Sequence, residues 1–153
     1  MTSASRSVHL LRAVVAAALV IGAREARAQL FAVSGSPPPL VVGTATAGFT
    51  PLASTDNSTT YTIFAYGRGN QKVTAQLSAA MPAGVTLKVQ LAAPGNATSL
   101  GLVALSTVAQ DVVTGVNNNL NTRSITYELS ATLAAGVVAR QSRTVTLTLI
   151  ATP

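Results

Sequence analysis

The chain of 153 residues contains no cysteine and no tryptophan, and the two absences narrow the range of functions. Without cysteine there is no thiolate ligand for zinc, no thiol nucleophile and no disulfide. The stability of the fold must therefore come from its apolar core and from hydrogen bonds between strands. Without tryptophan, and with aromatic residues at only 4% of the chain, the sequence lacks the flat rings on which glycan-binding sites often depend.

Acidic and imidazole side chains are also scarce. The only histidine is His9, and the only carboxylate side chains belong to Glu25, Asp56, Asp111 and Glu128. A paired-carboxylate mechanism needs two such groups about 5–10 Å apart across a cleft, but Glu128 falls on the polar face of an expected strand and Asp56 and Asp111 fall in loop-like segments. No acidic loop of the calcium-binding type is present. We therefore predict a protein that is not an enzyme, with no catalytic, cofactor-binding or metal-binding residues.

The N-terminal segment has the pattern of an export signal. Arg6 and Arg12 precede an apolar run at residues 13–23, and Ala26 and Ala28 form a small-x-small cleavage site before Gln29. The apolar run is shorter than the roughly 20 residues that a membrane-spanning helix needs. The pattern predicts that residues 1–28 are removed and that the mature chain, without a membrane span, reaches the periplasm, the cell surface or the medium.

Cleavage would also remove half of the net positive charge. Residues 1–28 carry +3 of the formal net charge of +6, together with His9. The remaining basic residues are spread along the chain, without a basic cluster interleaved with aromatics. Nucleic acid is therefore not an expected partner.

From residue 40 onward the apolar residues alternate with polar ones, as in half-buried strands. Glycine, proline and asparagine clusters separate the alternating segments. This pattern predicts an all-β domain over residues 40–153, an immunoglobulin-like or Greek-key β-sandwich of about seven strands. The expected strands are 40–47, 58–66, 71–79, 85–92, 100–107, 123–133 and 143–151, and residues 108–116 are either an eighth short strand or a loop crossing between sheets.

Two apolar segments are candidate interaction sites. Residues 29–39 form an N-terminal arm that ends in three prolines, and Leu30, Phe31 and Val33 make it apolar enough to dock on another surface; the alternative is a disordered tail. The other segment is a strand that is apolar on both faces and carries Tyr61, Phe64 and Tyr66. It is either a central strand covered on both sides or a docking face for another chain or a sugar.

Four stretches carry a pattern-level resemblance to a known kind of protein: YTIFAY at 61–66, KVTAQLSAAMPAGVTLKVQL at 72–91, RSITYELSAT at 123–132 and RTVTLTLIA at 143–151. In these stretches the chain resembles secreted bacterial β-sandwich proteins, of the fimbrial or pilin-like kind or the spore coat protein U-like kind. The resemblance brings no catalytic or binding motif. The chain departs from chaperone–usher pilins in having no cysteine pair and no penultimate tyrosine.

The resemblance implies a structural role. Pilin-like subunits assemble when an extended arm of one subunit completes the sheet of the next, which is β-strand addition. We therefore expect a non-enzymatic, secreted structural subunit of an extracellular or cell-surface assembly, which associates with itself or with another surface protein. The expected acceptor is the sheet edge beside strand 143–151 or strand 40–47. The alternative is a monomeric periplasmic or secreted module that binds a glycan or a protein partner.

Overall fold

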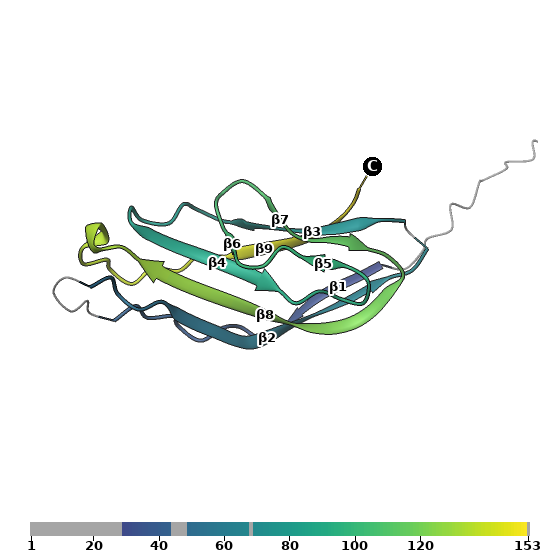
Figure 1. The fold of residues 1–153 in the computed structure, drawn as a ribbon, viewed down its shortest axis with the longest axis horizontal. Helices are drawn as coiled ribbons and strands as arrows, with labels where there is room; N and C mark the ends of the chain where they lie inside the picture. Colours follow the sequence, from purple (N-terminus) through teal and green to yellow (C-terminus); the bar gives the residue numbers. More distant parts are fainter. Residues whose placement is uncertain (1–28, 44–48, 68, 153) are drawn as a thin grey trace, which may run out of the picture.

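The computed structural model describes residues 29–43, 49–67 and 69–152, which form nine strands and one short 3-10 turn at Leu133–Ala135. The strands make two antiparallel sheets, and the predicted all-β, two-sheet architecture is confirmed (Figure 1). The five-stranded sheet has the order β1-β2-β8-β4-β6, and the four-stranded sheet has the order β5-β7-β3-β9. The strands are β1 (Gln29–Ser34), β2 (Ser54–Ala65), β3 (Gln71–Leu77), β4 (Val85–Leu91), β5 (Thr98–Ser99), β6 (Val103–Ala104), β7 (Gln110–Val116), β8 (Asn119–Ala131) and β9 (Val145–Ala151).

The strands differ from the expected ones in several places, and β2 and β8 each begin four residues earlier than expected. Residues 40–43 of the expected strand 40–47 are not in a strand, and residues 44–47 lie outside the described residues. The expected strand 100–107 is reduced to β6, because Gly101 adopts a φ of 73° and breaks the extended run after β5. Residues 110–116 of the ambiguous segment form β7, and the arm contains β1.

The core lies between the two sheets and follows the predicted alternation. Every second residue is buried from Thr59 to Ala65 of β2, from Gln71 to Leu77 of β3 and from Leu87 to Leu91 of β4, and the intervening positions are mostly polar and, apart from Thr74, more exposed. Burial of such apolar side chains stabilises a fold by about 1.5–3 kcal/mol each. The buried apolar residues are Tyr61, Ile63, Ala65, Val73, Ala75, Leu77, Leu87, Val89, Leu91, Leu105, Val112, Val113, Val116, Ile125 and Tyr127.

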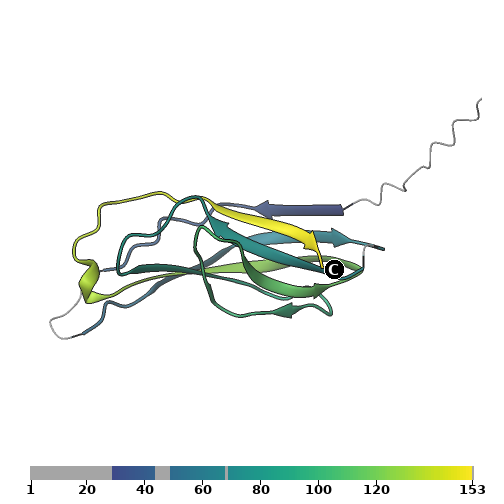
Figure 2. The same ribbon diagram turned by 90° about the horizontal axis from the view of Figure 1, so that it is seen from above.

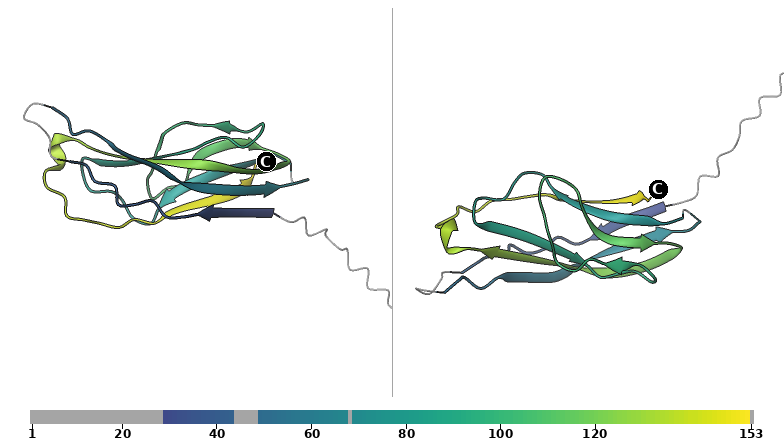
Figure 3. Two further views of the ribbon diagram at one scale, coloured as in Figure 1. Left: turned by 90° about the horizontal axis from the view of Figure 1, so that it is seen from below. Right: turned by 45° about the horizontal axis from the view of Figure 1, so that its top comes forward.

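The two long sides of the sandwich are closed in different ways. On one side, β5 and β6 are the outermost strands, and the chain passes directly from one sheet to the other between them. On the opposite side, the outermost strands are β1 and β9, which lie beside each other but belong to different sheets (Figures 2 and 3). Each of these two strands has one strand neighbour among the described residues. We call this the open side of the sandwich.

A tight backbone contact joins the turn before β4 to the end of β8. The Gly84 carbonyl accepts hydrogen bonds from the Thr132 N–H at 2.8 Å and from the Thr132 hydroxyl at 3.3 Å. Gly84 has a φ of 74°, and a Cβ added there would lie 2.8 Å from both the Ala135 nitrogen and Thr132 Oγ1. Both the backbone conformation and the space available therefore require glycine.

We expect Gly84→Ala to lower the free energy of unfolding by about 2–4 kcal/mol, because left-handed strain and a backbone clash add together. Gly101→Ala is the matched control, since Gly101 has a similar φ of 73° but no atom within 4 Å of an added Cβ. Gly101→Ala should lower the free energy of unfolding by only about 1–2 kcal/mol, because it introduces the left-handed strain without the clash. Urea unfolding followed by circular dichroism measures both. Equal losses in the two variants would contradict the role of the contact.

Candidate functional site

The carboxylate side chains of the described residues are separated and already engaged. Asp111 forms a 2.9 Å ion pair with Lys72 on the four-stranded sheet, and Glu128 forms one with Lys88 on the five-stranded sheet. Asp56 accepts a 3.2 Å hydrogen bond from the Ser58 N–H. Among the described residues, no group of three or more His, Cys, Asp or Glu side chains is placed to hold a metal ion. Each of these three described carboxylates is therefore engaged by a different partner.

The N-terminal arm is the most distinctive candidate site. Strand β1 pairs with β2 along its whole length, from Gln29 opposite Ala65 to Ser34 opposite Thr60. It is the outermost strand of its sheet, so only one strand holds it. Leu30 and Val33 remain 53% and 46% exposed, whereas Phe31 packs against the core. The three predicted arm residues therefore lie together on one edge strand.

Phe31 contacts a rigid part of the core. Its ring lies 5.8 Å from the ring of Tyr61, centroid to centroid, at an interplanar angle of 42°. Tyr61 is fully buried, and its hydroxyl donates a 2.6 Å hydrogen bond to the Ala92 carbonyl. Burial raises the pKa of Tyr61 to about 12, and nearby Arg123 lowers it only in part. The arm thus inserts one aromatic ring beside a side chain that the core holds in place.

The segment that follows β1 does little to hold the arm. Gly35 has a φ of 84°, and residues 36–39 are exposed and irregular. In the described part of the chain, no backbone hydrogen bond joins residues 35–43 to another segment. Leu40, directly after the prolines, again packs against the core. Residues 35–39 therefore act as a linker between two anchored points, and we call them the hinge segment.

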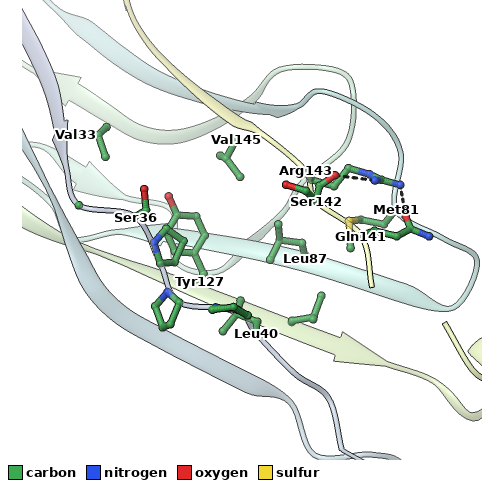
Figure 4. Close-up of a pocket in the computed structure, with 15 residues that line it drawn as sticks. Val33, Ser36, Leu40, Met81, Leu87, Tyr127, Gln141, Ser142, Arg143 and Val145 are labelled. Atoms are coloured by element: carbon green, nitrogen blue, oxygen red, sulfur yellow. Dashed lines mark hydrogen bonds between the residues drawn. The ribbon is translucent and has the colours of Figure 1, made fainter. Parts of the chain in front are cut away.

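A groove lies on the open side between the hinge segment and the chain that leads into β9. Its base is formed by Leu87, Tyr127 and Leu129 of the five-stranded sheet, and its volume is about 400 Å³ (Figure 4). Arg143 supports one wall, since its guanidinium donates hydrogen bonds to the Ala80 carbonyl at 3.1 and 3.0 Å. A second hollow of about 1000 Å³ continues toward the 3-10 turn, past Pro39 and Val137. The groove therefore has a mixed polar and apolar lining and runs beside the arm.

The second predicted site needs correction. Tyr61 points into the core and is 0% exposed, so it is not part of an exposed docking face. Phe64 and Tyr66 lie on the outer face of the five-stranded sheet, with ring centroids 5.2 Å apart, and Tyr66 is half exposed. The strand is apolar on both faces because one face packs in the core and the other carries this aromatic pair. The predicted cleavage residues Ala26 and Ala28 lie outside the described residues, and Gln29 begins β1.

Sequence reasoning missed two features of these surfaces. Strand register places Leu30, Phe64 and Leu120 side by side across β1, β2 and β8, and Leu30 and Leu120 are more than half exposed. We call these residues with Tyr66 the outer apolar patch. The other missed feature is the groove, which combines segments more than 40 residues apart in the chain. Neither leaves a local signal, because both depend on which strands are neighbours.

Comparisons with protein-family models, with curated proteins and with solved structures found no match for this chain. Among the described residues, no helix is long and apolar enough to cross a membrane.

We expect Phe31→Ala to loosen the arm without unfolding the domain. Removing most of a partly buried ring costs about 1–2 kcal/mol, so the protection of the amides in β1 should fall about 5–30-fold. Hydrogen exchange followed by mass spectrometry measures this, with β3 and β4 as internal references. The control Ala32→Ser changes an exposed position of the same strand. Equal exchange of β1 in the two variants would show that the Phe31–Tyr61 contact does not hold the arm.

The buried tyrosines predict a loss of stability in alkaline solution. The pKa of Tyr61 rises from 10.0 in the unfolded chain to about 12 in the fold, and burial also raises the pKa of Tyr127. The folded state therefore favours the neutral phenol. The resulting contribution to the free energy of unfolding is fully present below pH 10 and is lost as the pH rises toward about 12. Urea midpoints measured at about pH 8 and about pH 11 should differ less for Tyr61→Phe than for the unmodified protein. An identical difference in both proteins would contradict this assignment.

Proposed function

We propose that this chain is an exported, non-enzymatic structural subunit that joins a cell-surface or extracellular assembly by β-strand addition through its N-terminal arm. The observation that carries the proposal is the way β1 is held. It is a preformed strand that pairs with one neighbour and contacts the core through Phe31. A preformed strand can enter another sheet at a small cost in conformational entropy.

The sheet topology supports an immunoglobulin-like or Greek-key arrangement. Sequence neighbours are often placed in opposite sheets: β2 leads to β3 across the sandwich, and β8 leads to β9 across it again. This crossing leaves the first and the last strand at the open side. We infer that the fold is organised so that β1 and β9 border the surface where subunits would join.

Two sheet edges can receive an incoming strand. The first is β9, whose inward-facing Val145, Leu147 and Leu149 are only partly buried, although the β3 residues opposite them are nearly completely buried. The second is the edge of β2, which becomes free when the subunit's own β1 leaves. Unpaired strand edges are templates for added strands. The expected acceptor beside strand 143–151 thus has a structural basis, whereas residues 40–43 offer no strand edge.

A specific observation also favours the second candidate function, a monomeric module that binds a glycan or a protein. The outer apolar patch exposes Leu30, Tyr66 and Leu120 on one end of the five-stranded sheet. Exposed apolar side chains that lie together are characteristic of interaction sites. This candidate needs the patch but does not need the arm to leave its own sheet.

Deletion of residues 29–36 should abolish assembled species without unfolding the domain, because the buried core contains no residue of this segment. Sedimentation of the exported protein over a range of concentrations, together with circular dichroism, measures both properties. The matched control is Tyr66→Ser with Leu120→Ser, which alters two exposed residues of the outer apolar patch and keeps both the arm and the β2 residues opposite it; it should assemble normally. Assembly by the deletion variant would refute the proposal. An intact protein that stays monomeric at every concentration would favour the binding module.

A further inference from the structure

We propose that the acceptor of the arm is the β2 edge of a second copy of this chain, so that subunits join by exchanging β1. This proposal rests on the arm-mediated assembly proposed above and identifies its partner surface. In the exchanged state, β1 of one copy takes the position on β2 that the second copy's own β1 has left. The open side of each sandwich would then be completed by its neighbour.

The contacts needed for this exchange are already present within one copy. Strand β1 matches β2 residue for residue, with Leu30 opposite Phe64, Ala32 opposite Thr62 and Val33 opposite Tyr61. The ring of Phe31 also fits beside Tyr61. An arm from a second copy would make the same hydrogen bonds and the same ring contact. Since no new interaction is required, the free energies of the closed and the exchanged states differ mainly by the entropy lost when two chains associate. Exchange of an identical element is therefore a low-cost route to oligomers.

The domain can release β1 and keep its fold. The buried core cluster contains residues of β2, β3, β4, β7 and β8, and none of β1. Strand β2 also stays paired with β8 from Ser54 to Ala65. An opened subunit therefore retains its core and exposes the β2 edge together with the face of Tyr61. Such an exposed edge favours renewed pairing.

The hinge segment favours exchange, because it is too stiff for a released arm to fold back easily onto its own domain. Three consecutive prolines hold residues 37–39 extended, because each proline restricts φ and rules out a helical turn. Gly35 supplies the one conformationally free position between this stiff run and β1. Leu40 keeps the other end of the segment on the core. The arm would therefore rotate about Gly35 and point away from its own domain. The proline run beside it would act as a stiff spacer of about 3 Å per residue.

The β2 edge fits the arm better than the β9 edge does. On β2 the arm has a defined register and an aromatic neighbour, and both come from the structure itself. On β9 the inward-facing residues next to an added strand would be Val145, Leu147 and Leu149, none of which is aromatic. Each donor also vacates its own β2 edge, so every subunit that gives an arm can accept one. The exchange therefore balances donors and acceptors at every step.

The experiment uses the absence of cysteine, because engineered cysteines are then the only thiols. Ala32 and Thr62 lie opposite each other in the register of β1 and β2, and such pairs have Cα atoms about 4.5–5.5 Å apart, within disulfide range. Exported Ala32→Cys chains and Thr62→Cys chains are mixed at an assembling concentration and then oxidised. Peptide mapping should find a disulfide between positions 32 and 62 of different chains. The matched control mixes Ala32→Cys with Thr148→Cys, which is on β9, and should give no such link.

The double variant Ala32→Cys with Thr62→Cys tests whether exchange is required. Oxidised as a dilute monomer, its disulfide locks β1 onto its own β2, and we expect loss of the assembled fraction, restored by a reductant. Assembly of the locked protein, or a dominant link between positions 32 and 148, would overturn the exchange. Neither result would refute arm-mediated assembly itself, which the deletion of residues 29–36 tests separately. Assembly of that deletion variant would instead refute the proposed function itself.

Discussion

The pairing of β2 with β8 is the interaction on which the rest of this structure depends. These are the longest strands, and they pair from Ser54 opposite Leu129 to Ala65 opposite Asn119. On its other edge β2 carries the arm, and on its inner face it carries Tyr61, beside which Phe31 packs. On the other edge of β8 lies β4, which completes the central part of the sheet. The buried core cluster contains residues of both strands of this pair and none of the arm.

The two long sides of the sandwich differ in how the sheets end. Where β5 and β6 meet, the chain passes between the sheets and covers the core itself. Where β1 and β9 lie beside each other, each sheet ends in a strand with one strand neighbour among the described residues, and a groove lies between the segments connected to these strands. A small domain without disulfides gains most of its stability from burial in the core. In the proposed assembly, another chain completes the open side.

Much of the fold followed from local pattern. Alternation in residues 85–91 predicts a strand with Leu87 and Val89 inward, and the structure buries both. The segment around Gly101 misled the prediction, because its apolar residues suggest one strand, while the glycine conformation divides it into β5 and β6. The arm was recognised from Leu30, Phe31 and Val33, but its pairing with β2 was not. Pairing partners depend on contacts between distant segments, which period-two alternation does not encode.

By itself, the sequence determined the all-β class, the inward and outward faces of most strands, and the scarcity of groups that could catalyse a reaction. These properties follow from residue type and from an alternation that each strand carries independently. The tertiary structure alone decided that Tyr61 supports the arm from the core while Tyr66 faces outward. It also decided that Leu30, Phe64 and Leu120 form one patch and that β1 and β9 border one open side. These outcomes depend on strand order and register, which arise only when segments far apart in the chain pack together.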